Sequence, residues 1–244
     1  MALKPFKSIG IGVAYSPNLK ANLFEAARLA VFFQSKLFLI HVGESSEDKT
    51  TMLKVILKSF EKESLDYEVV FKTGDPVDVI LSTSEEKKID LLILGAVQRE
   101  RFLKYYVGSI ARKITREAKC SVLLLIKPSV ERIACEHIVV NGLKDPKTEQ
   151  TIKTAFYVAK KLSSEKITIV EEIKQDQISV KVDDDKSLRR ANIIKERIRH
   201  RENARIKEII SHIPATYTKN KTIKLQPIFG KKGYSIGHYA QVVR

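Results

Sequence analysis

The chain has few of the residues that mark several protein classes. Its 244 residues include two cysteines, no tryptophan and five histidines. Cys120 and Cys135 lie apart and form no CxxC pair, so the pattern excludes a disulfide framework and a cysteine-based zinc site. The chain also lacks an apolar run near the ~18 to 20 residues that span a bilayer, and its start lacks an apolar segment followed by a cleavage site. We therefore expect a cytoplasmic protein without a transmembrane segment.

Recognisable catalytic and metal-binding patterns are also scarce. The histidines do not follow the i, i+4 or short-loop spacing of metal ligands, so we expect no metal site. His41 and His137 fall in or beside apolar segments and are interpreted as core histidines with hydrogen-bond partners. No GxSxG nucleophile motif is present. We name no catalytic residue and expect a protein that is not an enzyme, with slow ATP hydrolysis as the upper limit of activity.

The chain is rich in basic residues. Its formal net charge is +15, and the excess lies mostly in the second half. A positive field of this size attracts anions such as nucleotides, nucleic acids or acidic lipid head groups. The hydrophobic content of 43% is that of a folded protein.

The first half alternates between apolar strand patterns and segments with helical spacing. The strand patterns are FKSIGIGVA, KLFLIHV, DYEVVFKTG, LLILG and CSVLLLIKP. Continuous Val, Ile and Leu runs joined by helices are typical of a parallel sheet covered on both faces. Over residues 5–128 we predict an α/β fold with a doubly wound, five-stranded parallel sheet and four helices. The apolar CSVLLLI strand should lie at an edge, or pair across a dimer or pseudo-twofold contact.

The second half begins the same cycle again. ACEHIVVNG, EKITIVEEI and TIKLQPIFG read as its strands, with a helical segment after each of the first two. The chain ends before the segments that would match the fourth strand, the phosphate-type loop, the last helix and the fifth strand of the first half. We therefore predict two domains: residues 1–129, and residues 130–244 as a partial, degenerate second α/β copy.

One loop carries the strongest functional signal. The buried strand 91–95 ends at Gly95, and the pair Gly108-Ser109 opens the next helix. The carboxyl edge of a parallel sheet and the free N–H groups at the start of a helix favour an anion. Ser109 has a second interpretation as an ordinary helix N-cap.

The spacing of this loop resembles the universal stress protein family, whose pattern is G-x2-G-x9-G-[S/T] before the last helix and strand. The segments GDPVDVILSTSEEKKIDLLILGA and GSIARKITREAKCSVLLLIKP are also similar to that family. The resemblance implies a Rossmann-like, nucleotide-binding fold of tandem copies, with a role in stress response, and a homodimer or an intramolecular pseudo-dimer. It implies that Gly95, Gly108 and Ser109 hold phosphates and that Val42 contacts adenine through its backbone. The implied ligand is ATP or another adenine nucleotide.

Two positions depart from the family pattern. Gln98, the fifth residue of the implied nucleotide site, stands where the middle glycine is expected, and Ala14 replaces the aspartate that binds the nucleoside in the family. We therefore interpret the protein as a non-catalytic stress or signalling module with a degenerate nucleotide pocket.

The basic second half leaves an alternative open. A ligand-free interaction protein would dock on nucleic acid, membrane or a transporter through the basic helical segment that contains Arg197, Arg199 and Arg201. The interspersed Glu196 and Glu202 favour a solvated helix face instead.

Overall fold

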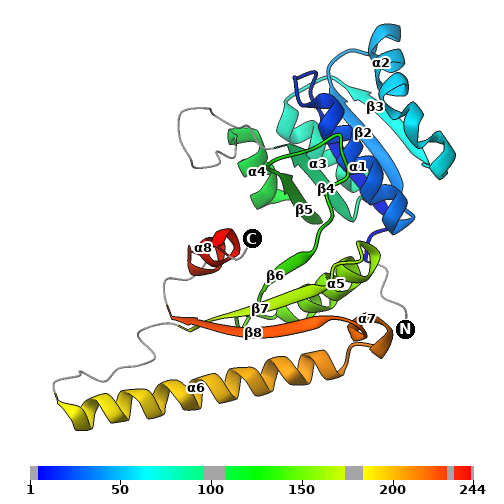
Figure 1. Ribbon diagram of the computed structural model, residues 1–244. Coiled ribbons are helices and arrows are strands. Elements are labelled where there is room, and N and C mark those ends of the chain that lie inside the picture. The colour runs from blue at the N-terminus through cyan, green and yellow to red at the C-terminus, as the bar shows by residue number, and fades with distance from the viewer. Residues whose placement is uncertain (1–4, 96–107, 174–183, 230–233, 243–244) are drawn as a thin grey trace. The chain divides into compact units, whose positions relative to one another are not determined.

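The structure is a computed structural model that describes residues 5–95, 108–173, 184–229 and 234–242. The chain divides between Ile133 and Ala134 into two compact units, each with its own parallel sheet (Figure 1).

The N-terminal unit alternates strands and helices along its whole length. Its elements are β1 (Ser8–Val13), α1 (Leu19–Phe33), β2 (Lys36–Val42), α2 (Glu47–Leu57) with the 3-10 helix η1 (Lys58–Glu63), β3 (Tyr67–Lys72), α3 (Pro76–Glu86), β4 (Leu91–Gly95), α4 (Ser109–Glu117) and β5 (Ser121–Leu125). The strands lie in the order β3-β2-β1-β4-β5, and each neighbouring pair is parallel. The predicted doubly wound five-stranded sheet is confirmed, with β5 at an edge.

Local sequence explains how the helices begin. Asp75 caps α3, because its Oδ1 accepts hydrogen bonds from the N–H groups of Val77 and Asp78 at 2.9 and 3.3 Å. Pro76 follows at a position where a missing N–H costs nothing. Ser46 caps α2 in the same way, with its Oγ 3.2 Å from the nitrogen of Lys49. These caps set where each helix starts relative to the strand that precedes it.

Helices cover both faces of this sheet. α3 and α4 pack with the central strands around a buried cluster that includes Ile40, Ile80, Leu92 and Ile114. α1 lies against β1 and β2 and contributes buried residues such as Leu23. Since both faces are covered, the central strands are apolar along their length, which produces the continuous hydrophobic runs of the sequence.

The C-terminal unit begins with the same order of elements. It contains β6 (His137–Asn141), α5 (Thr148–Lys161), β7 (Lys166–Ile173), α6 (Asp185–Ser211), α7 (Ala215–Thr218), β8 (Thr222–Phe229) and α8 (Tyr234–Val242). Its strands form a parallel sheet in the order β6-β7-β8. Phe156 of α5 and Ile206 of α6 are fully buried against Ile167 and Ile169 of β7. A second, smaller α/β unit therefore follows the first.

Candidate functional site

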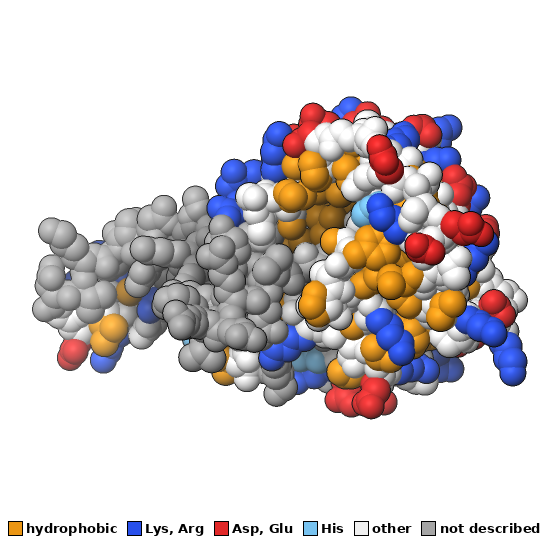
Figure 2. Space-filling view, turned by 90° about the horizontal axis from the view of Figure 1, so that it is seen from above, with side chains coloured by type: hydrophobic (Ala, Val, Ile, Leu, Met, Phe, Trp, Pro, Cys, Tyr) orange, Lys and Arg blue, Asp and Glu red, His pale blue; other side chains and the backbone are white. Residues whose placement is uncertain are grey.

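A cavity of about 700 Å³ opens at the carboxyl ends of β1, β2 and β4 and at the start of α4. Figure 2 shows a hollow surrounded by hydrophobic side chains on the face seen there. The crevice beside the carboxyl ends of the strands, where the strand order reverses, is the usual ligand position in such sheets. Here that reversal occurs at β1, which lies between β2 and β4. The fold itself therefore creates the candidate site.

The structure brings four of the five predicted site residues to this cavity. Val42 lies at the end of β2, Gly95 at the end of β4, and Gly108 and Ser109 at the start of α4, and all four line the cavity wall. Gln98 lies outside the described residues. The predicted residues are thus close in space although they come from three separate elements.

The start of α4 leaves backbone donors free of intrahelical bonds. Gly108 takes the N-cap position without a side-chain cap, and its carbonyl accepts the hydrogen bond from Arg112 N at 3.0 Å. The interpretation of Ser109 as the N-cap is therefore wrong, because Ser109 is the first helical residue. The N–H groups of Ser109, Ile110 and Ala111 have no partner one turn earlier in the helix. This helix end suits a phosphate or another small anion.

Gly95 allows a close approach between β4 and α1. A Cβ atom added at Gly95 would lie 2.8 Å from Nδ2 of Asn22. Asn22 Oδ1 is buried and has no hydrogen-bond partner among the described residues. Sequence reasoning missed Asn22, because nothing in the helical pattern of α1 distinguishes it from a surface residue.

An aromatic group with one cation forms another part of the wall. His41 of β2 contacts Tyr15 edge-on at 4.9 Å between ring centroids, and Tyr15 and His41 both line the cavity. The Lys49 ammonium lies 5.9 Å from the centre of the Tyr15 ring. Burial raises the pKa of the Tyr15 hydroxyl, so this phenol is neutral at physiological pH. His41 has a hydrogen-bond partner, as expected, and that partner is the Val13 carbonyl; its position in the cavity wall was not predicted.

The charges around the cavity favour an anionic ligand. Among the described residues that line it, Lys49 carries a positive charge and none is Asp or Glu. Ala14 also lines the cavity and supplies no polar side chain. The cavity therefore combines an apolar floor with a cation and the positive end of a helix.

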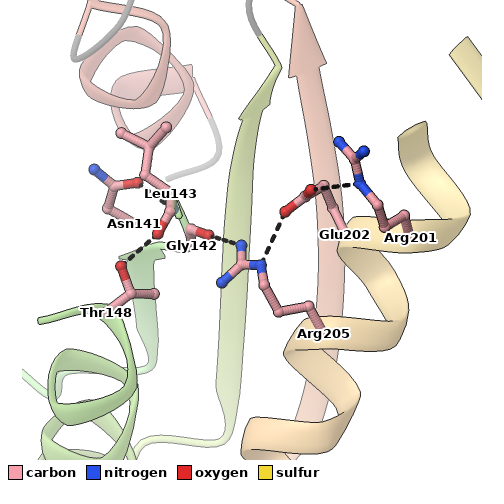
Figure 3. A network of polar contacts seen from close by, with 7 residues as sticks. All are labelled: Asn141, Gly142, Leu143, Thr148, Arg201, Glu202 and Arg205. Atoms are coloured by element: carbon pink, nitrogen blue, oxygen red, sulfur yellow. Dashed lines mark hydrogen bonds and ion pairs between the residues drawn. The ribbon is translucent and has the colours of Figure 1, made fainter. Parts of the chain in front are cut away.

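In the C-terminal unit, polar groups at the corresponding strand end are used internally (Figure 3). Asn141 Oδ1 accepts a hydrogen bond from Leu143 N at 3.0 Å, and the Thr148 hydroxyl donates to the Leu143 carbonyl. The Arg205 guanidinium donates to the Gly142 carbonyl. Asn141 Oδ1 is thus engaged in the turn that follows β6.

The three arginines predicted to dock on an anionic partner all lie on α6 and are exposed. Arg199 pairs with Glu196 at 3.2 Å, and Arg201 pairs with Glu202 at 3.2 Å. Glu202 also pairs with Arg205 at 2.9 Å. Neighbouring acids therefore neutralise part of this basic stretch.

Residues 5–95, 108–173, 184–229 and 234–242 contain neither a metal cluster nor a membrane-spanning helix. No three or more His, Cys, Asp and Glu side chains gather there in a way that would hold a metal ion. None of the helices there has the length and apolar character needed to cross a membrane.

Comparisons with known proteins agree with this fold. Residues 46–125 match the model of the Universal stress protein family. A universal stress protein of Methanocaldococcus jannaschii is 28% identical over 85 residues, which are 35% of this chain and 50% of the relative, so the match spans half of that relative's length. The crystal structure of a universal stress protein from Archaeoglobus fulgidus aligns with a TM-score of 0.66 and 16% identity, covering 97% of this chain and 83% of that one. A functionally unknown protein from Pseudomonas aeruginosa aligns with a TM-score of 0.68 and 15% identity, covering 97% of this chain and 78% of that one. Together with the β3-β2-β1-β4-β5 sheet, the family match identifies residues 46–125 as part of a universal stress protein domain.

Proposed function

We propose that the N-terminal unit binds an adenine nucleotide, ATP or an AMP-type ligand, in its cavity and acts as a non-catalytic stress or signalling module. The single observation that carries the proposal is a 700 Å³ cavity that joins the switch point of the sheet to the free N–H groups of α4. A nucleotide has the matching chemistry, because its phosphates are anionic and its base is flat and largely apolar.

Each part of the ligand has a candidate partner. The phosphates would accept hydrogen bonds from the backbone at Ser109 and Ile110, with Gly108 allowing close approach. By family resemblance, adenine would contact the backbone of Val42, next to the apolar side chains of Ile40 and Leu94 that line the cavity.

We propose weak binding, because Ala14 supplies no acceptor for the nucleoside. Loss of one such hydrogen bond costs about 1 to 3 kcal/mol, or roughly tenfold to a hundredfold in affinity. The affinity for ATP is therefore expected to be weaker than the low micromolar range. A pocket of this kind suits a ligand whose cellular concentration is high.

The test is calorimetry of the full chain with ATP and with AMP, in the presence of Mg²⁺. Ser109→Asp puts a carboxylate at the first position of α4, where it favours the helix but repels a phosphate. Ser109→Asn is the matched control of the same size without the charge. Binding that is lost in S109D and kept in S109N supports the proposal, whereas equal binding by both variants contradicts it.

We further propose that the outer edge of β5 mediates a homodimer or a pseudo-dimer. Among the described residues, β5 pairs with β4 alone, and an apolar edge of this kind invites association. Sedimentation at several protein concentrations tests this: a mass that stays at 27.7 kDa throughout would contradict a homodimer.

The alternative, docking on a polyanion through α6, has less support. Arg199 and Arg201 are paired with glutamates of the same helix, and such pairs are typical of a solvated helix face.

A further inference from the structure

The structure holds His41 in one defined orientation at the cavity. Its Nδ1 lies 3.0 Å from the Val13 carbonyl oxygen, and its ring packs edge-on against Tyr15 and against Phe71, at 4.9 and 5.7 Å between centroids. Gly43 leaves room for the same ring, because a Cβ there would lie 3.0 Å from Nε2. The backbone at Gly43 has φ +146°, which side chains with a Cβ rarely adopt. Four neighbours therefore fix how this histidine lies.

The bond to Val13 also determines which ring nitrogen carries the proton. A carbonyl oxygen can only accept, so Nδ1 must donate a proton to it. In the neutral imidazole the other nitrogen, Nε2, is then an acceptor with a free lone pair. Among the described residues nothing donates to Nε2. His41 therefore supplies an acceptor to a cavity that is also lined by Lys49, by the hydroxyl-bearing Tyr15 and Ser109, and by the start of α4.

The position of this acceptor matters because of Ala14. The carbonyl that holds His41 belongs to the residue directly before Ala14, and both His41 and Ala14 line the cavity. Position 14 is where a nucleoside would meet a carboxylate acceptor, and alanine has none. Nε2 of His41 is an acceptor that β2 brings to the same end of the sheet.

We propose that His41 is a specificity-determining residue that accepts a hydrogen bond from a ribose hydroxyl of the bound nucleotide through Nε2. This inference rests on the proposed function and goes beyond it, because it assigns recognition of the sugar to a side chain from the second strand. The site then prefers ribonucleotides to the deoxynucleotide that lacks the contacted hydroxyl.

The experiment compares ATP, 2′-deoxy-ATP and 3′-deoxy-ATP by calorimetry on the full chain at pH 8. A neutral hydrogen bond corresponds to a preference of about threefold to tenfold. We expect wild type to bind ATP more tightly than one of the two analogues by that factor. In His41→Phe, which keeps a ring but has no acceptor, the preference should fall to about one, while the affinity for that analogue stays nearly unchanged. His41→Gln retains an acceptor and should keep part of the preference.

Tyr15→Phe is the matched control, because it removes the Tyr15 hydroxyl, the other polar side-chain group of this aromatic contact, and keeps the ring. It should retain the preference. A preference that persists in H41F, is absent from wild type, or is lost only in Y15F overturns the assignment of His41. Failure of every nucleotide to bind overturns the proposed function together with this inference, so the two failures are distinguishable.

A measurement without ligand provides a second test. Nitrogen-15 NMR of the full chain distinguishes the two neutral tautomers of a histidine ring. We expect the His41 signals to show a protonated Nδ1 and an unprotonated Nε2. The opposite tautomer would overturn the proposal, because Nε2 would then be a donor.

Discussion

Glu171 makes the stability of the C-terminal unit depend on pH. It lies on β7 with 2% of its surface exposed, and neither carboxylate oxygen has a hydrogen-bond partner among the described residues. Burial raises the pKa of this carboxyl from 4.5 to about 7, and the negative charge of Glu202 adds to the increase. The positive charge of Arg205 lowers the pKa of Glu171 and so offsets part of this increase. Glu171 therefore changes its charge near neutral pH.

The direction in which the stability changes with pH follows from proton linkage. The folded state binds the proton more tightly than the unfolded state, so the stabilisation is fully present below about pH 4.5 and is lost as the pH rises toward 7. At about 1.4 kcal/mol for each pH unit between the two pKa values, the loss is roughly 3 kcal/mol. The cost of ionising Glu171 is therefore a substantial fraction of the free energy of unfolding of a small unit.

The assay is urea unfolding of the full chain at pH 5 and pH 8, followed by circular dichroism and by hydrogen exchange in β7. Glu171→Gln keeps the shape of the protonated acid and removes its titration. At pH 8 we expect the free energy of unfolding of E171Q to exceed that of wild type by up to roughly 3 kcal/mol. At pH 5 the difference should be less than about 1 kcal/mol. Glu165→Gln, at an exposed position just before β7, is the control and should follow wild type at both pH values.

The comparison between E171Q and wild type cancels the titration of the other groups, since both proteins share them. An equal difference between the two proteins at pH 5 and pH 8 would refute the reasoning, because it would mean that Glu171 titrates alike in the folded and unfolded chain.

Three further predictions concern the cavity, the second core and α6. Ala14→Asp should restore an acceptor and tighten ATP binding about tenfold in calorimetry, and unchanged affinity would argue against a role for position 14. Phe156→Ala should lower the free energy of unfolding of the C-terminal unit by about 3 to 5 kcal/mol in urea, because Phe156 is fully buried, while ATP binding to the N-terminal unit persists. Reversing Arg197, Arg199 and Arg201 to Glu should lower the salt needed for elution from heparin in proportion to charge, with little change in melting temperature. Saturable RNA binding by wild type near physiological salt would contradict this last expectation.

The sequence by itself determined the fold of the N-terminal unit. Continuous apolar strands separated by helical segments allow few arrangements, because parallel strands need crossover helices that cover both faces. The apolar strand 121–125 was accordingly predicted at an edge, and β5 lies there. The spacing from Gly95 to Gly108 and Ser109 also indicated the position of the cavity, because Gly95 ends β4, Ser109 begins α4, and all three residues line the cavity.

Only the tertiary structure decided what individual polar side chains do. Ile167, Ile169 and Glu171 are spaced two residues apart in β7 and therefore share one face of the sheet. The sequence alone does not say whether α6 covers the Glu171 carboxylate or leaves it in water. His41 reads as an ordinary strand histidine, and its tautomer depends on the register that places it beside Val13, which lies 28 residues earlier in the chain. Burial and hydrogen-bond partners across such distances arise from packing between elements, and local patterns of residues carry no information about them.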